Sequence, residues 1–192
     1  MRIGKLFEFE NAHIVRFCSS KRCKTSIHGH SYKLELVLKA NTLDKAGMVY
    51  DFGLLKGNIK QIIDAFDHST CLYIDDDKEY LEDIKKHSAR WIELPCNISA
   101  ENLSIVFFIL ISIILKNTQM HNNESVKVDR IKLNETRTGW AECEYEDAFY
   151  NDLPIIDISK ITFSQAILDD FSDPRLLEKI KNNEIFINPK EV

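Results

Sequence analysis

Two histidines separated by one glycine, His28 and His30, carry the most specific chemical signal in the sequence. Alternate residues of a β-strand point to the same face, so both imidazoles project together if the strand begins at or before His28. His13 ends an earlier strand-like segment and completes a set of three by cross-strand proximity. Three neutral imidazoles favour Zn²⁺, although Fe, Co and Cu are also chemically compatible. Three protein ligands leave one coordination position open, which is typical of catalytic metal sites.

Cys23 precedes the histidine pair in a polar segment that we expect to be a loop. Two functional roles are open for it, a fourth metal ligand or a separate reactive thiol. Its basic neighbours Arg22 and Lys24 favour the thiolate form. A loop cysteine without a role is the plainer alternative.

Acid–base chemistry is indicated at two further places. Asp67 and His68 follow a predicted helix directly, and a carboxylate beside an imidazole fixes its tautomer and raises its basicity. The simpler alternative is a helix end with a histidine near the negative end of the dipole. Glu135 ends a predicted strand, where its carboxylate can accept two parallel N–H bonds from a guanidine-like edge. On local grounds alone, a solvated glutamate is the simpler interpretation of Glu135.

The elements that must position these residues follow from hydrophobic periodicity. Strict alternation predicts antiparallel strands, and apolar residues at helical spacing predict two amphipathic helices. Asp51 and Ser99 are the expected N-caps of these helices. The predicted strands are 5–13, 30–38, 90–94, 126–133 and 139–145, and the helices are 52–66 and 99–117. The order indicates an α+β fold, with two helices on one face of an antiparallel sheet.

Length and composition suit one globular domain with appendages. We expect a domain at 1–150 with an insert near 73–92, then a partly helical extension at 151–192 whose last helix begins at Asp173-Pro174. The net charge of −5 argues against a nucleic-acid partner. The apolar run from Ile105 to Leu115 is too short to span a membrane. Five irregularly spaced cysteines and no signal-peptide pattern predict a cytoplasmic location.

Taken together, these motifs resemble the 6-pyruvoyl-tetrahydropterin synthase / 6-carboxytetrahydropterin synthase family. Each motif is weak alone, but six in register are specific, and the resemblance covers about residues 3–145. The matching segments are Phe9-Glu10-Asn11-Ala12-His13, Cys23 with His28-Gly29-His30-Ser31-Tyr32, Gly47-Met48-Val49-Tyr50-Asp51-Phe52, Asp67-His68, Ser99-Ala100-Glu101-Asn102-Leu103 and Asn134-Glu135-Thr136.

The resemblance implies a tunnelling fold (T-fold) and a homo-oligomer, a trimer or hexamer with intersubunit active sites. It implies Zn²⁺ held by the three histidines, with Cys23 as general base. Asp67 and His68 correspond to the other two members of the catalytic triad, which a neighbouring subunit supplies. Glu135 corresponds to the residue that anchors the 2-amino and N3 positions of the pterin, which reverses its local interpretation.

Two reactions occur within the family. We favour the queuosine-pathway lyase, which converts 7,8-dihydroneopterin triphosphate to 6-carboxy-5,6,7,8-tetrahydropterin with loss of acetaldehyde and triphosphate, because segment 135–140 looks like the bacterial enzymes of that branch. The alternative is 6-pyruvoyl-tetrahydropterin synthase, which only eliminates triphosphate. Four residues separate Cys23 from His28, a spacing between those usual for the two branches. The compact bacterial members of the family also lack the insert near 73–92 and the extension at 151–192. Rivals from other classes are a catalytically silent zinc- or pterin-binding protein and a structural zinc site with Cys23 as fourth ligand.

Overall fold

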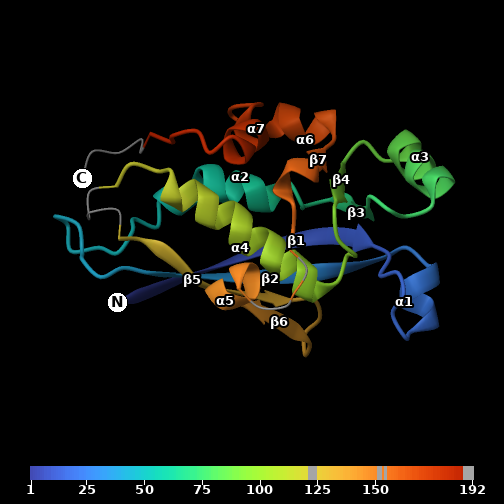
Figure 1. Cartoon of the computed structure of the whole chain (residues 1–192), viewed down its shortest axis with the longest axis horizontal. Helices are drawn as coiled ribbons and strands as arrows, with labels where there is room; N and C mark the ends of the chain where they lie inside the picture. The colour runs from blue at the N-terminus through green and yellow to red at the C-terminus, as the bar shows by residue number, and fades with distance from the viewer. Residues whose placement is uncertain (121–124, 151–152, 154, 188–192) are drawn as a thin grey trace.

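The computed structural model describes residues 1–120, 125–150, 153 and 155–187, which form one mixed sheet with helices on one side (Figure 1). Within these residues the sheet has seven strands in the order β6-β5-β2-β1-β3-β4-β7. The strands are β1 (Arg2–His13), β2 (His28–Lys39), β3 (Ser69–Tyr73), β4 (Trp91–Leu94), β5 (Lys127–Asn134), β6 (Trp140–Cys143) and β7 (Thr162–Phe163).

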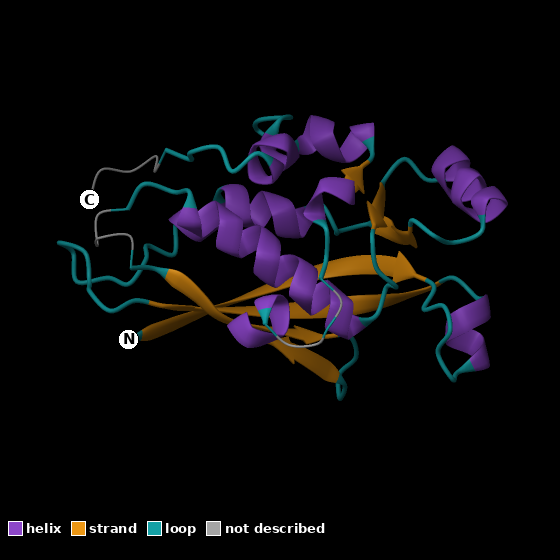
Figure 2. Cartoon of the chain, in the orientation of Figure 1, coloured by secondary structure: helices purple, strands orange, loops and turns teal. Residues whose placement is uncertain are grey.

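The longer strands alternate between a buried and an exposed face, as the sequence predicts. In β1, residues 7, 9, 11 and 13 are buried while residues 6, 8 and 10 are exposed. The buried face packs beneath the helices, as Figure 2 shows, and the core there includes Phe9, Tyr32 and Leu34. The α+β fold with an antiparallel β6-β5-β2-β1 group is therefore confirmed.

The rest of the sheet differs from the wholly antiparallel prediction. β3 was not predicted; it pairs parallel with β1 and with β4. Its five residues are mostly buried without alternation, so no period-2 pattern marks them. Parallel neighbours need a crossover connection, which here contains the charged helix α3 (Lys78–His87) of the insert.

Helix α4 (Ala100–Lys116) crosses the sheet and is capped by the Ser99 side chain, as predicted. It is apolar on nearly all sides because the sheet, α2 (Asn58–Asp64), α5 (Tyr145–Phe149) and α7 (Leu176–Lys181) all contact it. The predicted helix over 52–66 is interrupted. It is a 3₁₀ turn, η1 (Leu54–Lys56), followed by α2 (Asn58–Asp64), because Gly57 takes a non-helical conformation between them. Asp51 accepts a bond from the Gly53 N–H and so caps the turn before η1.

The segment after residue 150 joins the same core. β7 pairs antiparallel with β4, and η2 (Ile158–Lys160), α6 (Gln165–Asp170) and α7 (Leu176–Lys181) pack around it. Ile161, Ile167 and Ile180 are fully buried. The last helix begins later than the predicted Asp173-Pro174 start: Arg175 is its N-cap, and the Asp173 carboxylate instead accepts from the Arg175 N–H. The predicted boundary near 150 adjoins residues 151 and 152, which lie outside the described residues.

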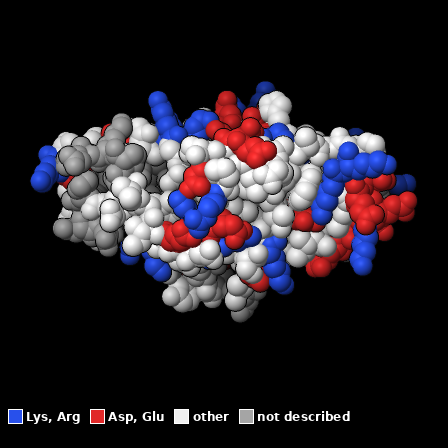
Figure 3. All heavy atoms as spheres, turned by 90° about the horizontal axis from the view of Figure 1, so that it is seen from above, with Lys and Arg blue, Asp and Glu red and all other residues white. Residues whose placement is uncertain are grey.

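No described helix combines the length and the apolarity that crossing a membrane requires. Figure 3 shows Lys and Arg side chains interspersed with Asp and Glu over the face seen from above.

Candidate metal centre and acid–base groups

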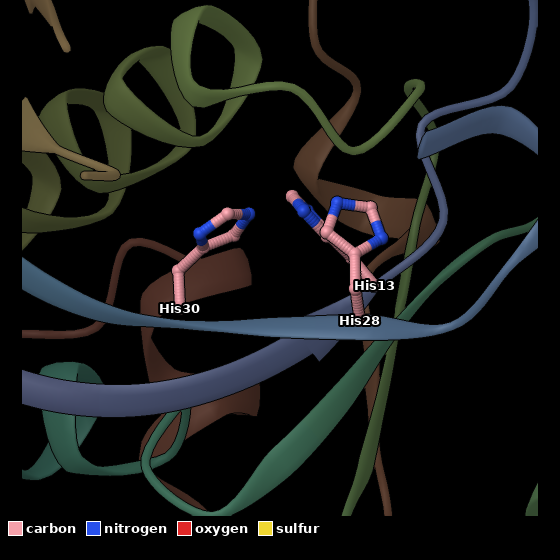
Figure 4. A group of neighbouring side chains, drawn as sticks. All are labelled: His13, His28 and His30. Carbon is pink, nitrogen blue, oxygen red and sulfur yellow. The ribbon is translucent and has the colours of Figure 1, made fainter. Parts of the chain in front are cut away.

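The structure brings His13, His28 and His30 together. One ring nitrogen from each lies within 4.8 Å of the others, and Figure 4 shows the three rings gathered above β1 and β2. The register of the two strands explains the cluster, because His13 pairs directly with His28. His30 is two residues further along β2 and therefore on the same face. Gly29 lets the strands approach: a Cβ there would lie 3.2 Å from the Asn11 carbonyl oxygen.

Hydrogen bonds on the outer ring nitrogens set the tautomers of two histidines. Nδ1 of His28 lies 3.0 Å from the carbonyl oxygen of Ser26, which can only accept, so this nitrogen carries the proton. Nδ1 of His13 lies 3.4 Å from the hydroxyl of Tyr32, which in turn donates to Oε1 of Glu135 at 3.2 Å. His13 therefore donates from Nδ1. The Nε2 lone pairs of both rings are left free for a ligand.

Burial keeps the His13 ring neutral. Its side chain is fully buried, and burial followed by repulsion from His28 and His30 lowers its pKa to about 3. Burial also lowers the pKa of His30, against the opposing effect of Glu135. Among the described residues, Nε2 of His13 has no hydrogen-bond partner, which is costly for a buried nitrogen. A metal ion that accepts this lone pair would remove the cost, so the residues fit the predicted metal.

Glu135 lies at the edge of the histidine group. Its Oε1 is 3.7 Å from Nε2 of His13 and 3.9 Å from Nε2 of His30. The hairpin between β5 and β6 holds it there, with its backbone N–H bonded to the carbonyl of Gly139. Burial and the Glu135 carboxylate both raise the pKa of Tyr32, so the phenol stays protonated and remains a donor. Tyr32 links Glu135 to the metal centre, a role that its place in the His-Gly-His-Ser-Tyr motif did not reveal.

Asp67 and His68 contact each other but stand apart from the histidine group. Oδ2 of Asp67 is 2.9 Å from Nδ1 of His68, whose side chain is 75% exposed. Burial raises the pKa of Asp67, but the bond from the Glu10 N–H and the contact with His68 outweigh it, so the net shift is downward. The backbone of His68 is also hydrogen-bonded to β1, because its N–H donates to the Glu10 carbonyl at 2.7 Å.

The His68 backbone has a left-handed φ of 52°, a costly conformation for a residue with a side chain. Arg90 supports the chain before it, donating to the carbonyls of Asp64 and Asp67 and pairing with Asp170 of the extension. A surface hollow of about 290 Å³ adjoins His68, and its lining also includes Glu10, Gly29 and His30 of the two long strands.

Cys23 lies in the five-residue helix α1 (Lys21–Thr25) and is partly exposed. It is not part of the group formed by the three histidines in the described part of the chain. This placement does not favour Cys23 as a fourth ligand. All five cysteines are free thiols.

Comparison with known proteins now identifies the fold and the family. Residues 2–146 match the family model described as 6-pyruvoyl tetrahydropterin synthase. The chain belongs to this family. A crystal structure of an uncharacterized Wolinella succinogenes protein superimposes with a TM-score of 0.63 at 21% identity, covering 76% of this chain and 98% of that one. The Caenorhabditis elegans 6-pyruvoyl tetrahydropterin synthase gives a TM-score of 0.51, also at 21% identity, over 75% and 94% of the two chains. The T-fold prediction is thus confirmed.

Curated members of the family are similar along most of the sequence. A Helicobacter pylori (strain J99) protein named 6-carboxy-5,6,7,8-tetrahydropterin synthase is 33% identical over 188 residues, covering 96% of this chain and 93% of that protein. A Rickettsia typhi protein of the same name is 38% identical over 107 residues, covering 55% and 75%. The Helicobacter match therefore takes in most of the C-terminal extension.

Proposed function

We propose that this protein is a zinc-dependent lyase that converts 7,8-dihydroneopterin triphosphate to 6-carboxy-5,6,7,8-tetrahydropterin with loss of acetaldehyde and triphosphate. The observation that carries the proposal is the similarity to the Helicobacter pylori protein of that name along 96% of the chain. The histidine group with its free nitrogen lone pairs supports the metal requirement. Queuosine biosynthesis is the pathway that we expect this reaction to serve.

In this proposal His13, His28 and His30 hold the ion. Bound Zn²⁺ would supply Lewis-acid chemistry, which acidifies the C–H and O–H groups of the substrate side chain. The Cys23 thiolate would remove a proton, and His68, oriented by Asp67, would relay or return it. Glu135 would accept bonds from the pterin edge and fix the ring relative to the metal, which is an orientation effect.

We further propose that the active site is completed between subunits of a homo-oligomer, either a trimer or a hexamer. Within one protomer His68 of the Asp67–His68 pair is exposed and Cys23 is separate from the histidine group, which fits a site that a neighbour completes. A cytoplasmic location is consistent with five free thiols. The basic residues Lys21, Arg22 and Lys24 of α1 are candidates to meet the triphosphate.

Product identification tests the proposed reaction. Purified protein is incubated with 7,8-dihydroneopterin triphosphate, with and without a metal chelator, and the products are analysed by mass spectrometry. We expect 6-carboxy-5,6,7,8-tetrahydropterin and acetaldehyde, and neither after chelation. Release of triphosphate with 6-pyruvoyl-tetrahydropterin and no acetaldehyde would establish the alternative, the reaction that the family model's description names. Metal and pterin binding without turnover would contradict both.

A further inference from the structure

The short helix that carries Cys23, α1, is held by Arg16, whose side chain contacts two residues of the insert. Nε of Arg16 donates to both carboxylate oxygens of Asp76, at 2.9 and 2.8 Å. Its guanidinium also lies over the ring of Tyr80, with the carbon 5.1 Å from the ring centroid. Asp76 is 8% exposed and Arg16 is 23% exposed, so solvent screens this ion pair less than a surface pair.

The same guanidinium reaches the helix of Cys23. Nη1 of Arg16 donates to the carbonyl oxygen of Lys24 at 3.0 Å, and the Val15 N–H donates to the carbonyl of Cys23 at 3.0 Å. The carbonyl groups of Cys23 and Lys24 in α1 thus accept hydrogen bonds from Val15 and Arg16, two consecutive residues that precede the helix. This anchoring matters because α1 has five residues, none of them buried, and no side-chain N-cap. A helix of that length has little stability of its own.

The backbone of Arg16 is fixed from a third side. The Asn97 side chain accepts from the Arg16 N–H at 2.9 Å and donates to its carbonyl at 2.5 Å. The next residue, Phe17, has a left-handed φ of 64° although its side chain is 87% exposed. A strained backbone without compensating burial persists only where its surroundings hold it. Figure 1 shows α1 and α3 at the same end of the molecule.

We infer that Arg16 and Asp76 are positioning residues for Cys23, and that the insert serves to hold the thiol-bearing helix through this ion pair. The inference rests on the proposed function for the catalytic role of Cys23. The proposal that Arg16 and Asp76 hold helix α1 in place rests only on the contacts above. Among the described residues, the contacts of Arg16 include none of the side chains proposed to react, so its removal should act on the placement of Cys23 and leave the metal centre intact.

Arg16→Met tests this directly, because methionine keeps an apolar stem against Tyr80 and removes every donor. We expect Cys23 to be alkylated by iodoacetamide about tenfold faster, since helix α1 opens more often, as measured by peptide mass spectrometry. We expect kcat to fall by roughly ten- to a hundredfold with KM nearly unchanged. Zinc content should equal that of the parent protein. Faster alkylation and a lower kcat, together with unchanged zinc content and KM, would distinguish this effect from a general destabilisation of the protein.

Three further variants sharpen the test. Asp76→Asn removes the charge and should reproduce both effects, and it replaces Arg16→Met if that variant does not fold. Arg16→Lys keeps the positive charge and one donor nitrogen, and should restore part of kcat. Arg2→Met is the matched control, because it breaks a similar arginine–carboxylate pair, that with Asp129, near the opposite end of β1. It should match the parent protein in alkylation and kcat.

Two outcomes would overturn the inference: alkylation of Cys23 in Arg16→Met and Asp76→Asn at the parent rate, or a kcat equal to that of the parent. If the parent protein shows no turnover, the proposed function fails by itself. The alkylation rate and backbone hydrogen exchange over 21–26 then still decide whether the ion pair holds the helix.

Discussion

The metal centre and the acid–base groups lie on different kinds of structure. The three histidines project from two long paired strands, where strand register fixes their positions relative to one another. Cys23 and His68 lie on short connections, and the backbones of Phe17 and His68 are strained. The candidate metal site is thus assembled within one chain on paired strands, whereas the residues proposed to move protons depend on distant side chains for their placement. Proton transfer depends on small distances, so this second region is where the activity is more easily disturbed.

His28→Ala should have the largest effect, because it removes one of the three candidate metal ligands. We expect zinc affinity to fall by at least about a hundredfold, and turnover to fall to background. Zinc content after dialysis against a weak chelator, measured by atomic absorption, checks this. Retention of stoichiometric zinc would show that the three histidines do not act as one site.

Cys23→Ala should show that metal binding by the histidines does not depend on the Cys23 thiol. It removes the proposed base and leaves the histidine group intact, so we expect bound zinc to be unchanged while kcat falls by roughly 10²–10⁴. The two measurements must be made on one preparation. Loss of zinc along with turnover would instead make Cys23 a metal ligand.

Glu135→Gln tests the carboxylate between the metal centre and the proposed pterin site. The variant loses the charge and one acceptor, so we expect pterin binding to weaken by roughly ten- to a hundredfold. Binding of a non-reactive pterin by fluorescence titration checks this, with Glu82→Gln on α3 as a surface control. Equal affinity in parent and variant would count against the anchor role.

The smallest expected effect is an acid-induced loss of stability in the metal-free protein. The folded pKa of His13 is lowered to about 3 from 6.5, so between these values the unfolded state binds more protons. Stability should therefore fall as pH drops through 6.5, by about 1.4 kcal/mol per unit below it. Asp67, also with a lowered pKa, contributes only below its unfolded value of 3.8. Urea unfolding at pH 7 and 5.5 measures the loss, and His13→Gln should reduce it.

Sequence patterns predicted the elements where periodicity was strong and long. β1, β2, β5 and α4 appear close to their expected bounds, because alternation and an N-cap mark them. β3 escaped prediction because it is short and buried without alternation, and the helix over 52–66 was predicted too long across Gly57. The three histidines were predicted as a cluster and found as one. The supporting residues Tyr32 and Arg16 were not assigned roles.

The sequence by itself determined which side chains share a strand face, because the period of two is a local property of the backbone. It placed His28 beside His30, and the family motifs pointed to the chemistry. Tertiary structure alone decided the register that sets His13 directly opposite His28, the link from His13 through Tyr32 to Glu135, and the contact of Asp76 with Arg16, 60 residues away. These contacts depend on how strands pair and where the insert folds back. No local pattern encodes such long-range geometry, so the placement of the proposed base became visible only in the folded chain.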